Sequence, residues 1–173
     1  MNRVTPQIES FALRLITHET KGSKTPETIA EASFRVFEKL QQKLALLMGN
    51  GGYRALLSRA LALANAEISW LNMLRVNADG SLDEADELGA QIAPNQMVEG
   101  YSALLAQLLG LMVAFIGEKI TLGLLSEVWP KFKIRKSELE SQYAFQNSQD
   151  VIIARSAEKK REKNQSNLSF ISY

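Results

Sequence analysis

Residues 100–117, GYSALLAQLLGLMVAFIG, form an uncharged stretch of 18 residues that Glu99 and Glu118 close on either side. A helix of this length comes close to the roughly 20 apolar residues that span a bilayer. The stretch therefore fits either a membrane span or the buried centre of a soluble bundle. Three glycines, one serine and Gln107 lower its hydrophobicity.

The smallest residues of this stretch fall on one face when they are placed at helical intervals. Leu, Met, Val, Phe and Ile occupy most of the remaining surface. A stripe of small residues lets a second helix approach closely, either in a membrane helix pair or in a soluble core. That second helix could belong to the same chain or to another copy. The stripe consists of Ala103, Ala106, Gly110, Ala114 and Gly117.

Three amphipathic helices are predicted before this stretch, and each has a single apolar face. Thr5-Pro6 and Thr25-Pro26 have the composition of helix starts, because threonine caps the first turn and proline fits the first helical position. The glycine-rich residues 49–52 separate the second helix from the third. The predicted helices span residues 6–20, 26–48 and 53–71.

The three one-sided helices favour the soluble interpretation, because each needs an apolar surface to cover its stripe. A helix that is apolar on nearly all sides supplies such a surface. We therefore predict an all-α bundle around a long central helix, residues 95–129, of roughly 50 Å, which Pro130 ends. A single membrane span, or peripheral attachment to a membrane, is the less favoured alternative.

One short region departs from the helical pattern. Asp79-Gly80 is typical of a tight turn, and the short segments around it predict a β-hairpin within residues 74–83. We expect strands nowhere else. The following residues, up to Pro94, are acidic and polar and are predicted to lie on the surface.

The net charge of +1 hides an asymmetry along the chain. Residues 1–130 carry 11 Lys and Arg against 14 Asp and Glu, whereas residues 131–173 carry 9 against 5. We therefore divide the chain into an α-helical bundle domain, residues 1–130, and a basic C-terminal segment, residues 131–173. This segment is expected to contain an amphipathic helix over residues 131–145, and residues 155–167 are expected to be solvated or disordered.

The basic residues of the C-terminal segment could contact the phosphates of nucleic acid or of anionic lipid. Acidic residues dilute each cluster, and a solvated tail is the simpler interpretation. The candidate contact residues are Lys131, Lys133, Arg135, Lys136, Arg155, Lys159, Lys160, Arg161 and Lys163.

The composition offers little for catalysis or for metal binding. The chain has no cysteine and a single histidine, His18, so thiol nucleophiles and the usual zinc ligand sets are missing. Glu118 is the most notable carboxylate, yet no companion group accompanies it at a catalytic spacing. We therefore expect no enzymatic activity, cofactor or metal.

Two stretches, GGYRALLSRALALANAEISWL and EGYSALLAQLLGLMVAFIGEKITLGLLSEVWP, resemble segments of small uncharacterised bacterial all-helical proteins with no assigned activity. The resemblance covers about residues 30–130 and implies a bacterial origin. It carries no catalytic signature, so no functional residue follows from it.

These features predict a non-enzymatic helical interaction or adaptor module that binds a partner protein or self-associates. The alternative is a nucleic-acid-associated accessory protein that uses the basic C-terminal segment. A cytoplasmic location is expected, because MNRVTPQIESFALRL lacks the basic start, apolar core and cleavage site of a secretory signal.

Overall fold

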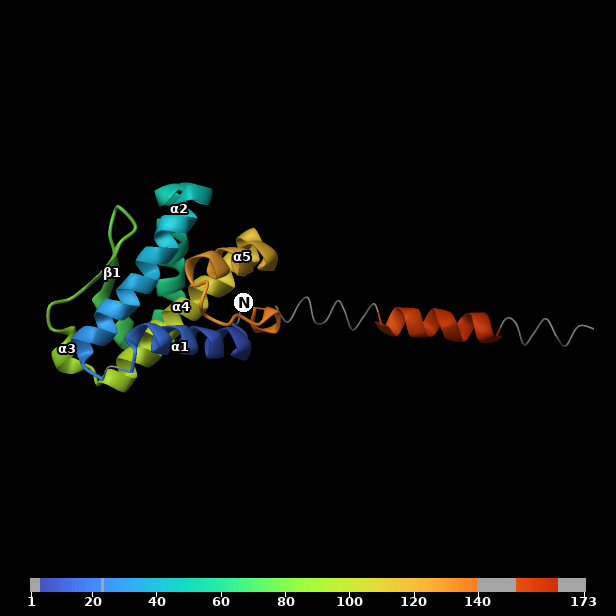
Figure 1. Ribbon diagram of the computed structural model, residues 1–173, viewed down its shortest axis with the longest axis horizontal. Coiled ribbons are helices and arrows are strands. Elements are labelled where there is room, and N and C mark those ends of the chain that lie inside the picture. The colour runs from blue at the N-terminus through green and yellow to red at the C-terminus, as the bar shows by residue number, and fades with distance from the viewer. Residues whose placement is uncertain (1–3, 23, 140–151, 165–173) are drawn as a thin grey trace, which may run out of the picture. The chain divides into compact units, whose positions relative to one another are not determined.

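The computed structural model describes residues 4–22, 24–139 and 152–164. The chain divides into two compact units, Met1–Leu139 and Glu140–Tyr173. The first unit is a bundle of helices with one small hairpin (Figure 1). In the second unit the described residues, 152–164, form one helix whose side chains are all exposed. Each unit is described by itself.

Threonine caps begin the first two helices, as predicted. The Thr5 hydroxyl accepts a hydrogen bond of 3.3 Å from the Ile8 amide at the start of α1 (Pro6–Thr20). The Thr25 hydroxyl accepts one of 3.4 Å from the Thr28 amide at the start of α2 (Pro26–Asn65). Each hydroxyl satisfies a backbone donor that has no partner within its helix.

Helix α2 is divided into two arms at Gly49, where the backbone has φ 75° and ψ 166°. Residues with a side chain rarely adopt this conformation, so the break at residues 49–52 depends on glycine. The second arm ends at Asn65, and the prediction that it reaches residue 71 is wrong. Ile68 is extended, with φ −125° and ψ 99°, and the chain continues as the 3₁₀ helix η1 (Ser69–Met73).

The predicted hairpin is confirmed. Strands β1 (Leu74–Val76) and β2 (Leu82–Glu84) pair antiparallel, with Leu74 opposite Glu84. The Tyr101 hydroxyl donates to the Glu84 carboxylate at 3.2 Å and so ties the hairpin to the central helix. Burial raises the pKa of Tyr101, and the neighbouring Glu84 carboxylate raises it further. The short helix α3 (Leu88–Gln91) follows in the acidic region.

The prediction of one continuous helix over residues 95–129 is wrong. The structure has two helices, α4 (Pro94–Ile116) and α5 (Glu118–Val128), separated by Gly117 with φ 87° and ψ 158°. This glycine-dependent conformation redirects the chain. Helix α5 lies beside the first arm of α2, where the Lys43 ammonium and the Glu127 carboxylate form an ion pair of 3.2 Å.

Helix α4 is the centre of the bundle and packs against both α1 and α2. Its inner face is closed to solvent at Leu104, Leu105, Leu108 and Leu109. Among the residues described, only α4 is long and apolar enough to cross a membrane, judged by length and composition. Of the 18 residues that make up its most apolar part, 56 % are buried in the bundle. The prediction of an all-α bundle around an apolar helix is confirmed.

Residues 130–139, which we call the strap, run over α1 instead of forming the first part of a helix. The predicted helix over 131–145 is thus wrong for residues 131–139, where the 3₁₀ turn η2 (Lys136–Glu138) is the only helical element. Pro130 blocks a helical continuation of α5. Residues 140–145 lie outside the described part of the chain.

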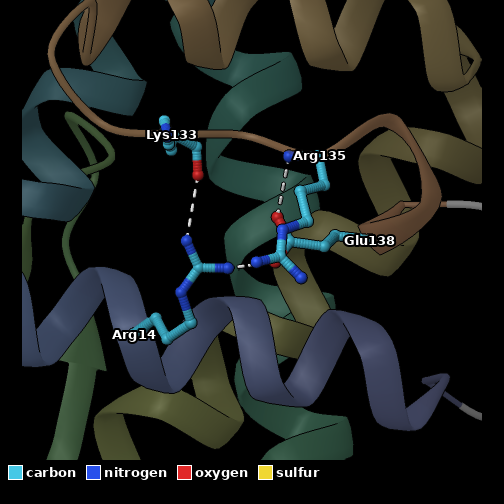
Figure 2. Close-up of polar contacts among 4 residues, drawn as sticks. All are labelled: Arg14, Lys133, Arg135 and Glu138. Carbon is cyan, nitrogen blue, oxygen red and sulfur yellow. Dashed lines mark hydrogen bonds and ion pairs between the residues drawn. The ribbon is translucent and has the colours of Figure 1, made fainter.

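Aromatic and ionic contacts hold the strap on α1. The Phe132 ring packs edge-on against Phe11 at 5.6 Å and lies 5.2 Å from the His18 ring. The Arg14 guanidinium pairs with the Glu138 carboxylate and donates to the Lys133 carbonyl at 2.9 Å (Figure 2). The first compact unit therefore ends at Leu139, which is fully buried, nine residues beyond the boundary expected from the charge pattern.

Glu19 joins α1 to α2 and to the end of α5. Its carboxylate accepts a hydrogen bond of 2.7 Å from the Trp129 indole and pairs with the Lys39 ammonium at 3.1 Å, while its side chain is 12 % exposed. Glu19→Ala leaves the indole N–H without its acceptor and is expected to lower the free energy of unfolding by about 1–3 kcal/mol. Urea denaturation measures this change.

The matched control for Glu19→Ala is Glu127→Ala, because Glu127 also pairs with a lysine of α2 but is 64 % exposed. Exposed ion pairs contribute at most about 1 kcal/mol, so this control is expected to change stability little. Equal effects of the two substitutions would show that Glu19 is no more important than a surface ion pair.

Candidate functional site

A groove follows the side of α4 that faces away from its leucine-rich core. Helix α1 and residues 67–68, which follow α2, also contribute to its lining. The groove has a volume of about 470 Å³, within the range of protein binding sites, about 300–1,000 Å³. It is the candidate functional site of the bundle.

The small-residue stripe contributes part of this groove. Ala103 and Ala106 line it, whereas Gly110 lies under Val4, so that an added Cβ would sit 3.5 Å from the valine Cγ2. Ala114 and Gly117 lie farther along and are exposed. The chain's own N-terminal segment thus covers the stripe at Gly110, and the stripe is open at Ala103.

Apolar side chains form the walls around the alanine floor. Leu13 belongs to α1 and Val4 precedes it, Ile68 follows α2, and Val98 is on α4 itself. Leu13 is 47 % exposed, although it is a large apolar residue beside a well-formed core. Leu13 therefore adds exposed apolar surface to the groove.

Three carboxylates, Glu9, Glu67 and Glu99, lie at the exposed rim of the groove. The described residues that line it include no lysine or arginine. The field at the rim is therefore negative and favours a cationic ligand. Sequence reasoning missed these residues as a site; only Glu99 shares a helix face with the alanine stripe, whereas Glu9 and Glu67 join it through the packing of α1 and α2.

The polar groups inside the groove belong to α4. The Ser102 hydroxyl donates to the Val98 carbonyl at 2.6 Å, one turn earlier in the same helix. Gln107 lines the groove farther along and is 8 % exposed. The groove thus combines apolar walls with the polar side chains of Ser102 and Gln107 and with charge at its edge.

The nine basic candidates divide between the two units. Lys131, Lys133, Arg135 and Lys136 are exposed on the strap. In that group the Lys133 carbonyl accepts from Arg14, and the Arg135 amide donates to the Glu138 carboxylate at 3.0 Å. The other five are exposed on the helix of residues 152–164: Arg155, Lys159, Lys160, Arg161 and Lys163.

Glu118 is the first residue of α5 and is half-buried. A carboxylate in the first helical turn interacts favourably with the helix dipole, which accounts for an acid at this position. Within residues 4–22, 24–139 and 152–164, no group of three or more His, Cys, Asp or Glu side chains is placed to hold a metal ion.

Comparison of the chain with protein-family models, with curated proteins and with solved structures finds no match. Its function is therefore inferred from the fold and from the groove.

Proposed function

We propose that this protein is a non-enzymatic helical interaction module whose α1–α4 groove receives an amphipathic helix of a partner protein. The observation that carries the proposal is an open groove of about 470 Å³ beside the central helix, in which six apolar side chains are lined up next to three exposed carboxylates. Helices with one apolar face bind such grooves through side chains spaced three and four residues apart.

The shape of the groove supports a helix as the ligand. Its lining residues on α4 extend from Asn95 to Gln107, which corresponds to roughly 18 Å, or about three helical turns. The floor at Ala103 carries only a methyl group, so a docked backbone can come close to α4 there, whereas Ala106 is 1 % exposed. Leu13 of α1 and Val98 of α4 both line the groove and offer apolar side chains to such a helix.

The chemistry of the groove supports binding instead of a reaction. Its hydroxyl group, on Ser102, is hydrogen-bonded within α4, and its carboxylates stand at the exposed rim. Catalytic carboxylates usually occupy sites that exclude water and change the pKa of the carboxyl group. The groove instead combines apolar walls with a charged edge, as protein-binding surfaces do.

A fluorescently labelled synthetic helical peptide tests this proposal. The peptide carries leucines at helical spacing and lysines along both flanks, and its scrambled version has the same composition without an apolar face. We expect saturable binding of the amphipathic peptide, measured by fluorescence anisotropy. Ala103→Trp fills the groove and is expected to weaken this binding by about tenfold or more, a change of about 1.4 kcal/mol.

Ala114→Trp is the matched control, because Ala114 lies on the same helix but is exposed and outside the groove lining. It is expected to leave the affinity unchanged. Equal loss in both variants, or equal binding of the scrambled peptide, would contradict the proposal.

Nucleic-acid binding is the second candidate, favoured by the five exposed basic residues on the helix of residues 152–164. Contacts to phosphates weaken steeply with salt, because binding releases counterions. A labelled DNA duplex is therefore expected to bind at low ionic strength and to dissociate on a moderate increase in salt. Absence of binding at low salt would eliminate this candidate.

A further inference from the structure

We infer that the groove binds the basic helix, residues 152–164, of a second copy of this chain. The inference rests on the proposed function and names the partner for the same groove. Two properties support it: the charges of the groove and of the helix are complementary, and the chain leaves the bundle on the side of α1 away from the groove.

The helix of residues 152–164 has the sequence IIARSAEKKREKN, and at 100° per residue its side chains separate into unlike faces. Ile152, Arg155, Lys159 and Lys163 fall within roughly 80° of one another; we call this the basic face. Glu158 and Glu162 border it on one side, and Arg161 lies on the opposite surface. One face thus combines an apolar anchor with three cations.

The groove presents the opposite charge around an apolar interior. Glu9 is on α1, Glu67 follows α2, and Glu99 is on α4 itself. A helix that inserts Ile152 between the apolar walls would have the lysines and arginine of its basic face near these carboxylates. Opposite charges at the edge of an interface increase both the rate and the selectivity of association.

The lengths of the two surfaces also agree. The helix of residues 152–164 has 13 residues and rises roughly 18 Å, which equals the length of α4 along the groove. Ile152 and the adjacent Ile153 are each 64 % exposed, so two large apolar side chains of this helix are uncovered. Docking would remove apolar surface from water on both partners.

The strap and the groove lie on different flanks of α1. The strap side chains contact Phe11, Arg14 and His18, whereas Glu9 and Leu13 line the groove. Around the α1 axis these two sets are separated by roughly 100–180°. The bundle therefore ends at Leu139 on the flank of α1 away from the groove, and we infer that the basic helix in the groove belongs to a second copy.

Charge exchange tests this inference in the full-length protein. Variant A carries Glu67→Lys and Glu99→Lys, and variant B carries Lys159→Glu and Lys163→Glu. At low salt the unmodified chain is expected to self-associate, as measured by sedimentation velocity at two concentrations. Each variant alone places like charges together and is expected to self-associate at least about tenfold more weakly.

A mixture of A and B restores opposite charges at both grooves. The basic helix of A faces the acidic groove of B, and the helix of B, now acidic, faces the groove of A, now basic. The mixture is expected to recover the A–B dimer. Arg161→Glu changes the same kind of charge on the opposite surface of the helix and is expected to leave self-association unchanged, and circular dichroism confirms that each variant is folded.

A chain that is monomeric at every concentration, or a mixture of A and B that does not associate, overturns the inference. The proposed function has a separate readout, since the synthetic peptide would still bind a groove whose natural partner is another protein. A labelled duplex that binds the unmodified chain and competes with self-association would assign the basic face to nucleic acid and would also overturn the inference.

Discussion

Gly100→Ala is expected to lower the free energy of unfolding by about 1–3 kcal/mol, the usual cost of overpacking a core. A Cβ at this position would lie 2.1 Å from Cζ2 and 2.7 Å from Cε2 of Trp70, so the indole or α4 has to move. The indole also packs edge-on against Tyr101 at 5.6 Å. Because that tyrosine is fully buried and bonded to the hairpin, the displacement affects several elements at once.

Gly110→Ala is the control on the same helix. Its added Cβ would stand 3.5 Å from Val4 Cγ2, which is ordinary van der Waals contact. Alanine favours a helix over glycine by about 0.5–1 kcal/mol, so this substitution is expected to be neutral or stabilising. Urea denaturation measures the free energy of unfolding of both variants. Equal values would show that Trp70 does not pack tightly on Gly100.

Gly117→Ala is expected to destabilise the fold by about 1–3 kcal/mol through the backbone alone. Gly117 has φ 87° and ψ 158°, and no atom lies within 4 Å of an added Cβ. An alanine would favour a continuous helix through the break. It would then pull α5 away from α2 and strain the contacts at Lys43 and Trp129.

Gly123→Ala in α5 is the control for the backbone conformation of Gly117. An added Cβ at Gly123 also meets no atom within 4 Å, but Gly123 lies within a helix. It is expected to stabilise the protein by about 0.5–1 kcal/mol. Thermal unfolding should therefore shift in opposite directions for the two variants. A shift in the same direction would contradict the assignment of the break to the conformation of Gly117.

The elements that sequence reasoning located depend on neighbouring residues. Thr5 and Thr25 cap the helices that directly follow them, and Asp79-Gly80 forms the turn between its own two strands. Such signals act over a few residues, so they can be interpreted without knowledge of the tertiary structure.

The features that sequence reasoning missed depend on residues far apart in the chain. Gly100, Gly110 and Gly117 cannot be distinguished by their sequence context in one apolar stretch. In the structure Gly100 packs against Trp70, Gly110 lies under Val4, and Gly117 breaks the helix. The strap resembled an amphipathic helix because Phe132 and Leu139 are apolar, but both side chains pack onto the bundle instead.

The acidic rim shows the same limitation. Glu9 and Glu67 are separated by most of α1 and all of α2, and they border one groove only because both helices pack against α4. Their sequence context is that of ordinary solvated helix residues. Two residues of the small stripe, Ala103 and Ala106, line this groove, and the role of the stripe as an interface stays a prediction.

Occupancy of the groove by a second copy is tested most directly by thiol protection, because the chain has no cysteine. Ala103→Cys introduces a single thiol on the groove floor, and Ala114→Cys introduces one on the exposed part of the same helix. The rate of maleimide labelling is measured while cysteine-free protein is added at low salt. We expect the unmodified chain to slow labelling at residue 103 but not at residue 114, and the chain with Lys159→Glu and Lys163→Glu to protect neither thiol. A labelling rate at residue 103 that does not change as the unmodified chain is added would contradict this account.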